Sequence, residues 1–183
     1  MPLSPGTPDT GEASREAVET VAVSREEARN TALRSLASAA RTRHQLAELL
    51  SKRGVSQQIS DELLDRFVEV GLINDADFAM TWVKGRQQSR CLSRRVLRHE
   101  LRKKGIDDIT IESALEQIDD DDEREAALRL AAKKIRSLSR YDEATQRRRL
   151  ASMLMRRGYS SDVVAAVIAQ VADDSDAAQE ATL

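Results

Sequence analysis

The stretch Arg94–Ile106 reads R-R-V-L-R-H-E-L-R-K-K-G-I and carries the pattern that decides the fold. Leu97 and Leu101 are four residues apart, so they share one helical face and are expected to be buried. The cations near the end of the stretch suit the negative end of a helix dipole. Gly105 suits the left-handed residue that follows a helix. The stretch therefore predicts a helix that ends at a glycine turn, with Ile106 packing back against it.

This pattern, R-x-x-L-x-x-x-L-x-x-[RK]-G followed by an apolar residue or Tyr, occurs three times. Its glycines are Gly54, Gly105 and Gly158, so successive copies are 51 and 53 residues apart. Apolar residues recur ten and thirteen positions after each glycine, which predicts a second helix after every turn. A period of about 50 residues is typical of tandem copies of one supersecondary unit.

We therefore expect an all-α fold in which three tandem three-helix repeats form an elongated, curved array. The Pro-, Ser-, Thr-, Gly- and Glu-rich start of the chain has no apolar period and is expected to be disordered. The expected segments are a disordered extension (1–24), repeat 1 (25–73), repeat 2 (74–119), repeat 3 (120–172) and an acidic flexible tail (173–183).

Composition agrees with a helical protein and excludes several classes. Charged residues make up 33% of the chain, and the three prolines all lie within the first eight residues. Aromatic residues make up only 3%, which argues against binding of single strands by base stacking. We expect no membrane span, no secretory signal and no internal disulfide, because there is no long apolar run and only one cysteine. This profile indicates a cytoplasmic protein.

The net charge of −2 conceals two basic clusters. Residues 81–105 contain nine Lys and Arg against the single acid Glu100, and residues 129–157 contain ten against Asp142 and Glu143. Such clustering favours a polyanion or an acidic protein groove as the partner. The alternative is that the charges belong to ordinary solvated helix faces.

The predicted binding residues are basic side chains on the second helix of each repeat. In repeat 2, Arg94, Arg98 and Arg102 recur at helical spacing beside the buried leucines. For Arg53, Lys104 and Arg157, at the helix ends, a structural role is at least as plausible as binding. The full predicted set is Arg43, Arg94, Arg95, Arg98, Arg102, Lys103, Arg147, Arg148, Arg149 and Arg156.

No catalytic residue, metal site or cofactor is predicted. Cys91 and His99 could form a nucleophile pair, but a lone cysteine in a helical array is more often a small apolar filler. The acidic run 119–123 lacks the spacing and the glycine of a calcium loop, so it is interpreted as the acidic start of a helix.

On these residues the chain resembles the bacterial regulatory protein RecX family over about residues 25–172. The resemblance rests on the threefold repeat, on GLINDADFA (71–79), on RVLRHELRKKGI (95–106) and on ALRSLASAARTRHQLAELLSKRG (32–54). Members of that family often carry glycine near the position of Cys91.

The resemblance implies a regulatory protein that is not an enzyme. It implies binding to the RecA recombinase, especially its filament on single-stranded DNA, and inhibition of its ATP hydrolysis, strand exchange and filament growth. An elongated monomer lying in the filament groove would fit this role, with direct contact to single- or double-stranded DNA left open. The alternatives are a stand-alone helical DNA-binding protein and a neutral adaptor repeat.

Overall fold

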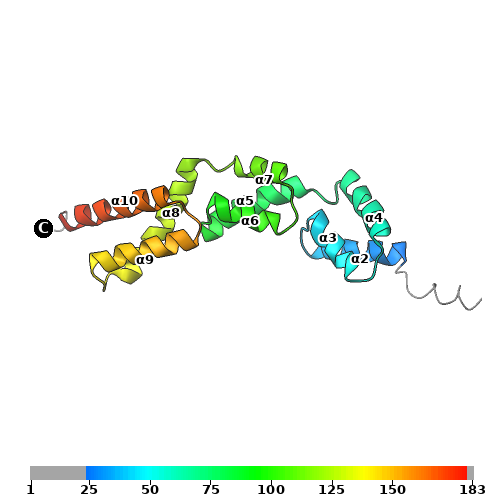
Figure 1. The fold of residues 1–183 in the computed structure, drawn as a ribbon, viewed down its shortest axis with the longest axis horizontal. Helices are drawn as coiled ribbons and strands as arrows, with labels where there is room; N and C mark the ends of the chain where they lie inside the picture. The colour runs from blue at the N-terminus through cyan, green and yellow to red at the C-terminus, as the bar shows by residue number, and fades with distance from the viewer. Residues whose placement is uncertain (1–23, 181–183) are drawn as a thin grey trace, which may run out of the picture. The chain divides into compact units, whose positions relative to one another are not determined.

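The computed structural model describes residues 24–180, and all regular structure in that range is helical (Figure 1). The all-α class is therefore confirmed, and residues 1–23, predicted to be disordered, lie outside the described residues. The elements are α2 (Arg25–Ser38), α3 (Arg43–Ser51), α4 (Gln57–Glu69), α5 (Asp75–Arg90), α6 (Arg94–Arg102), α7 (Asp108–Leu115), α8 (Asp120–Ile135), the 3-10 helix η1 (Arg136–Leu138), α9 (Glu143–Arg156) and α10 (Ser161–Glu180).

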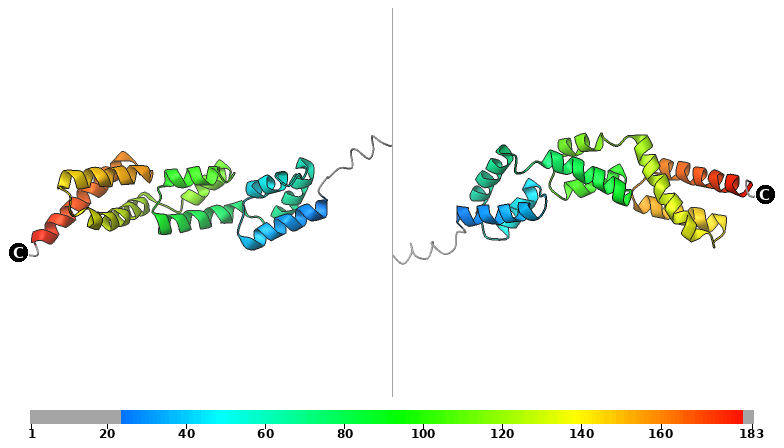
Figure 2. Two further views of the ribbon diagram at one scale, coloured as in Figure 1. Left: turned by 90° about the horizontal axis from the view of Figure 1, so that it is seen from below. Right: turned by 180° about the vertical axis from the view of Figure 1, so that it is seen from behind.

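The described residues divide into two compact units, one on each side of the boundary between Ile73 and Asn74. In the first unit, α2, α3 and α4 pack around one apolar core. The second unit contains two such groups, α5–α7 and α8–α10, each with its own core (Figures 1 and 2). The three helix triplets predicted from the repeat are thus present. None of the helices in residues 24–180 is long and apolar enough to cross a membrane.

The glycine turns have the predicted left-handed backbone. Gly54, Gly105 and Gly158 have φ values of 79°, 75° and 88°. In each copy the amide after the glycine donates to the carbonyl of the second leucine, five residues back, as in a Schellman turn. The residue that contains this amide is buried in all three copies, so each turn folds its apolar residue back onto the helix that it ends.

The leucine pairs of the three copies form the centre of each core. All six side chains are at most 2% exposed, and each contributes about 1.5–3 kcal/mol by leaving water. They are Leu46, Leu50, Leu97, Leu101, Leu150 and Leu154.

Short polar side chains begin the helices. Ser24 forms a capping box with Glu27 at the start of α2. The side chains of Asn74, Ser93 and Asp107 each accept the amide of the third residue of the helix that follows, in α5, α6 and α7. Each cap satisfies a donor that the helix itself leaves unpaired.

The acidic run 119–123 begins a helix, as interpreted from the sequence. Asp119 caps α8, which starts at Asp120, and the acids suit the positive end of the helix. At the end of the chain, α10 continues to Glu180, past residue 173, where the acidic tail was expected to begin. No glycine or proline interrupts residues 173–180, and alanines favour continuation of the helix.

Repeats 2 and 3 meet within the second unit in a close joint. The Tyr159 hydroxyl donates to the Cys91 carbonyl at 2.9 Å, and Arg157 Nη1 donates to the Arg90 carbonyl at 2.6 Å. Burial raises the pKa of Tyr159, so the phenol stays protonated and remains a donor. A side chain on Gly158 would overlap the Ser93 hydroxyl and a methyl group of Val96. The joint therefore requires a residue without a side chain at position 158.

Cys91 is the one non-glycine residue with positive φ in residues 24–180, at 46°. It ends α5 in the left-handed region and accepts the Tyr159 hydroxyl through its carbonyl. Glycine would adopt this backbone without steric cost, whereas a cysteine at this position is strained.

We predict that Gly158→Ala destabilises the protein more than Gly54→Ala does. Both changes place a side chain at positive φ, which costs about 1–2 kcal/mol. Only Gly158→Ala also forces atoms into a packed joint, which adds about 1–3 kcal/mol. Urea unfolding followed by circular dichroism measures the free energy of unfolding of each variant and of the wild type. Equal losses in the two variants would show that the joint is not tightly packed.

Candidate interaction surface

The described residues contain no group of three or more His, Cys, Asp or Glu that could hold a metal ion. The acidic run that was considered for a metal forms the first turn of α8, where Asp119 accepts the Asp122 amide at 2.7 Å. The candidate binding residues are the cations predicted from the sequence, and their partners decide which of them are available for binding.

The stripe Arg94, Arg98 and Arg102 lies on one flank of α6, and all three side chains pair with acids of the same unit. The partners are Asp120 for Arg94 at 3.1 Å, Glu112 for Arg98 at 2.6 Å and Asp108 for Arg102 at 2.7 Å. Two of these acids belong to α7 and one to α8. The stripe thus ties α6 to the helices that follow it.

The Arg98–Glu112 pair has the best geometry of the three. Arg98 Nε and Nη2 donate to the two carboxylate oxygens of Glu112 at 2.6 and 2.8 Å. These hydrogen bonds lower the pKa of Glu112 and raise the pKa of Arg98. The guanidinium is thus already occupied by a carboxylate in the free protein.

Two more predicted residues are paired in the same manner. Arg43 Nη2 lies 2.6 Å from Asp65 and 3.4 Å from Asp61, and the hydrogen bond that it donates to Asp65 raises the pKa of Arg43. Arg147 lies 2.5 Å from Glu143, one turn earlier on α9. Half of the predicted binding residues therefore have a carboxylate partner within their own unit.

Four predicted residues are exposed and form no ion pair among residues 24–174, although the charge of Arg148 contributes to the lowered pKa of Asp142. We call them the outer cations, and they are Arg95, Lys103, Arg148 and Arg156. They occupy equivalent positions, since Arg148 follows Arg95 by 53 residues and Arg156 follows Lys103 by the same number. On each helix the two cations are eight residues apart, or about 12 Å.

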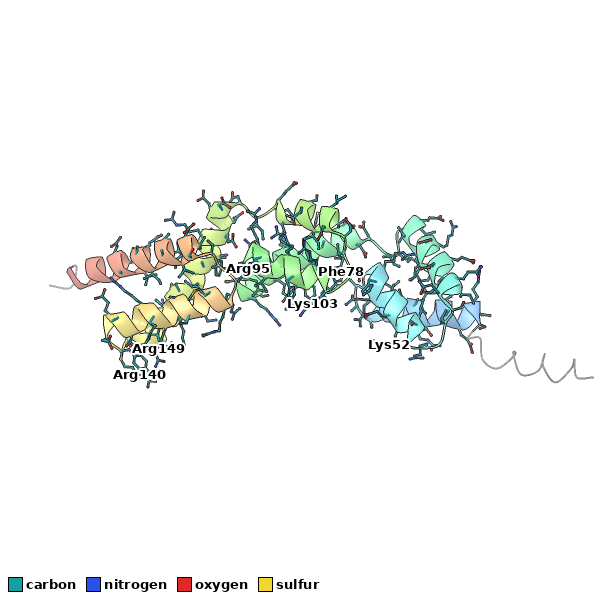
Figure 3. All side chains as sticks on the ribbon, in the orientation of Figure 1. Lys52, Phe78, Arg95, Lys103, Arg140 and Arg149 are labelled. Carbon is teal, nitrogen blue, oxygen red and sulfur yellow. The ribbon has the colours of Figure 1, made fainter. Side chains whose placement is uncertain are left out.

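Figure 3 labels Arg95 and Lys103 near the two ends of α6. Arg95 Nε donates to the Gly158 carbonyl at 3.3 Å, so one of its donors supports the joint and the others remain available. Lys103 is the C-cap residue of α6 and makes no side-chain contact with an acid among the described residues. The outer cations are thus held on rigid helices and directed away from the core.

One residue of this kind was missed by the sequence analysis. Lys52 precedes Lys103 by 51 residues, caps α3 at the same position and is exposed (Figure 3). The sequence does contain this pattern. Each of the three glycine turns is preceded by two basic residues, and the first of the two is Lys52, Lys103 or Arg156. In repeat 1 the position of Arg95 is occupied by His44, which lies 3.4 Å from Glu48.

Two of the cations at the helix ends have structural roles. Lys104 Nζ lies 3.9 Å from the ring centroid of Trp82, whose Nε1 donates to Glu100 at 2.8 Å. Arg157 donates to the Arg90 carbonyl across the joint. The structural interpretation is therefore confirmed for these two residues. Arg149, from the predicted set, lies over the ring of Tyr141 with its Cζ 4.1 Å from the centroid.

The comparisons with known proteins cover all three repeats. Three family models match, described as the first, second and third three-helix domains of RecX, at residues 28–67, 74–115 and 121–168. The regulatory protein RecX of Streptomyces coelicolor is 44% identical over 149 residues, which cover 81% of this chain and 79% of that protein. The corresponding protein of Mycobacterium marinum is 42% identical over 178 residues, covering 96% and 98%.

Solved structures agree with these matches. The crystal structure of RecX from Lactobacillus salivarius has a TM-score of 0.72 and 25% identity, covering 80% of this chain and 95% of that chain. A second crystal structure, of a regulatory protein RecX, has a TM-score of 0.71 and covers 90% of this chain. The likeness therefore includes the arrangement of the helices as well as the sequence.

We predict that Arg98 and Glu112 stabilise the fold through each other. A double-mutant cycle with Arg98→Gln and Glu112→Gln should give a coupling of about 0.5–1 kcal/mol near neutral pH, since both side chains are partly solvated. Because the pKa of Glu112 is lowered from its ordinary 4.5, this coupling is present above about pH 4.5 and is lost as the pH falls through the lowered pKa.

Urea unfolding at about pH 7 and about pH 3 measures this coupling. The exposed pair Arg66–Glu69, three residues apart on α4, serves as the control and should give a smaller value. A coupling for Arg98 and Glu112 that does not change with pH would contradict the assignment.

Proposed function

Since the chain belongs to the RecX family of regulatory proteins, we propose that it binds the filament of the RecA recombinase on single-stranded DNA and inhibits its ATP hydrolysis. Inhibition of ATP hydrolysis would accompany inhibition of strand exchange and of filament growth, and would thereby modulate recombination and DNA repair. In this proposal the protein acts in the cytoplasm as a monomer, without a cofactor and without catalysis of its own.

The observation that carries the proposal is the placement of the outer cations. They recur at equivalent positions of successive repeats and form no ion pair in the described part of the chain. A helical polymer presents the same acidic or phosphate groups at regular intervals, so tandem repeats can engage several of them at once. Several weak contacts on one chain give a high combined affinity.

The ion pairs divide the predicted residues by role. Arg94, Arg98 and Arg102 would have to break an existing ion pair before they could bind another acid. Arg95 and Lys103, on or next to the same helix, form no such ion pair, although Arg95 Nε donates to the Gly158 carbonyl. We therefore assign the filament contact first to the outer cations and regard the paired arginines as supports of the repeat.

A charge reversal of the stripe would not test binding. It would place new glutamates against Asp108, Glu112 and Asp120, and like charges at these distances destabilise the unit. Neutral substitutions of the outer cations avoid this problem, because they leave the internal ion pairs intact.

We predict that removal of the outer cations weakens inhibition of RecA about 10- to 100-fold, because charge complementarity governs encounter and supplies part of the affinity. The variant combines Arg95→Gln, Lys103→Gln, Arg148→Gln and Arg156→Gln. Titration into a RecA ATPase assay on single-stranded DNA measures the midpoint, and circular dichroism verifies the fold. The wild type should inhibit at substoichiometric amounts.

The matched control removes four exposed cations that have partners within their own unit. It combines Arg25→Gln, Arg66→Gln, Arg124→Gln and Arg129→Gln, so both variants lose the same charge. An equal loss of inhibition in both would indicate that only net charge matters. Normal ATP hydrolysis in the presence of excess wild-type protein would refute the proposed function itself.

A stand-alone DNA-binding protein is the second candidate, and the same outer cations favour it because they also suit phosphate groups. This candidate predicts tight binding of DNA without RecA and a steep dependence on salt. Weak binding in the absence of RecA would remove it and leave the filament as the target.

A further inference from the structure

A tyrosine packed beneath two guanidinium groups lies at the start of α9. Tyr141 follows η1, and the Cζ atoms of Arg149 and Arg140 lie 4.1 and 4.9 Å from its ring centroid. Arg140 Nη2 also donates to the Tyr141 hydroxyl at 2.9 Å. Figure 3 labels both arginines at this end of α9. The three side chains form what we call the Tyr141 stack.

The backbone around the stack is fixed. The Tyr141 amide donates to the Leu138 carbonyl at 2.9 Å, and Gln146 Nε2 donates to the Tyr141 carbonyl at 2.7 Å. The ring packs partly against the core of the third repeat. Gln146 and Arg149 are one helical turn apart, so the same side of α9 that holds the loop also carries the guanidinium over the ring.

The arginines of the stack have no carboxylate partner in the described part of the chain, although both are exposed. Residues 133–149 contain seven Lys and Arg and only two acids, Asp142 and Glu143. Both acids are engaged, since Asp142 caps α9 and Glu143 pairs with Arg147. The hydrogen bonds of the cap lower the pKa of Asp142, so it stays ionised as a cap. The segment around the stack therefore carries more positive charge than its two acids can balance.

We propose that the Tyr141 stack is a binding site for single-stranded nucleic acid, in which an unpaired base stacks on the outward face of the Arg149 guanidinium. The base would continue the stack that Tyr141 begins. Arg140 directly precedes Tyr141, and Arg148 directly precedes Arg149 on α9. Both are placed to meet the phosphates on either side of the stacked base. Guanidinium planes and aromatic rings both stack on bases, and neighbouring cations attract the backbone.

The arrangement favours a single strand with unpaired bases over two other anionic partners of a basic surface, an acidic peptide and a duplex. An acidic peptide needs only positive charge, and the ring adds nothing to its binding. A duplex keeps its base faces inside the helix, so it can use the arginines but not the stack. Only a strand with accessible bases can use the whole site. Its bases stack on the guanidinium and the ring, and its phosphates meet the excess positive charge.

This site goes beyond the proposed function and does not depend on it, because no RecA is required. Its ring distinguishes it from the outer cations, which offer charge alone, although Arg148 belongs to both groups. It modifies the expectation from composition, in which few aromatic residues argued against stacking. One ring suffices for a stacking site when two guanidinium groups accompany it.

The test compares three ligands of equal length: an oligo-dT strand, a strand of abasic deoxyribose phosphates and a DNA duplex. Fluorescence anisotropy of labelled ligands with the full chain and no RecA gives each Kd. We expect the wild type to bind oligo-dT about 5- to 100-fold more tightly than the abasic strand, which carries the same phosphates without bases. Equal affinity for the two single strands would overturn the proposal.

Two variants assign the preference to the stack. Arg149→Lys keeps the charge and removes the flat guanidinium, so it should lower affinity for oligo-dT and leave affinity for the abasic strand nearly unchanged. Tyr141→Leu keeps an apolar side chain over the core and should have the same selective effect. Arg147→Gln, from the adjacent ion pair, serves as the control and should lower both affinities alike.

The variants also separate binding from folding. If Tyr141→Leu lowers the melting temperature, Arg149→Lys alone decides the question, because Arg149 is exposed and makes no core contact. An unchanged ratio of the two Kd values in Arg149→Lys would show that the stack only covers the core.

Discussion

The structure depends on a steric constraint at the end of the second helix of each repeat. The backbone at Gly54, Gly105 and Gly158 turns into the left-handed region, where a side chain is strained. The turn sends the next residue back onto the leucines of the helix that has just ended, and that contact closes the core of the repeat. At Gly158 the same absence of a side chain has a second consequence, because it lets repeat 3 approach Ser93 and Val96 of repeat 2.

The packing of the helices then determines which cations are paired with an acid and which remain available to a partner. Once α7 and α8 are packed beside α6, their acids lie within reach of Arg94, Arg98 and Arg102 and neutralise that flank. Arg95, beside this stripe, and Lys103, at the end of α6, are exposed and form no ion pair among residues 24–174. A short basic helix thus carries both paired and unpaired cations. The unpaired cations are the ones that we propose for the partner.

The two kinds of exposed site suit different features of a nucleoprotein filament. Cations at equal positions of successive repeats suit a polymer whose charges recur at intervals. The Tyr141 stack suits a base that is not paired. A regulatory protein of the RecX family that combines both could distinguish a single-stranded filament from a duplex, because charge alone does not separate the two.

The sequence by itself determined the helices, the repeat, the glycine turns and the buried leucines, because each follows from local spacing and backbone sterics within one helix and its turn. It did not reveal that Arg98 faces Glu112, fourteen residues later, because packing of α7 beside α6 brings the two together. Nor did it reveal that Tyr141, in the turn before α9, lies against the Arg149 guanidinium. Only the tertiary structure could separate the arginines that pair with a carboxylate from those that do not, because a charge becomes occupied through the acids that the fold places beside it.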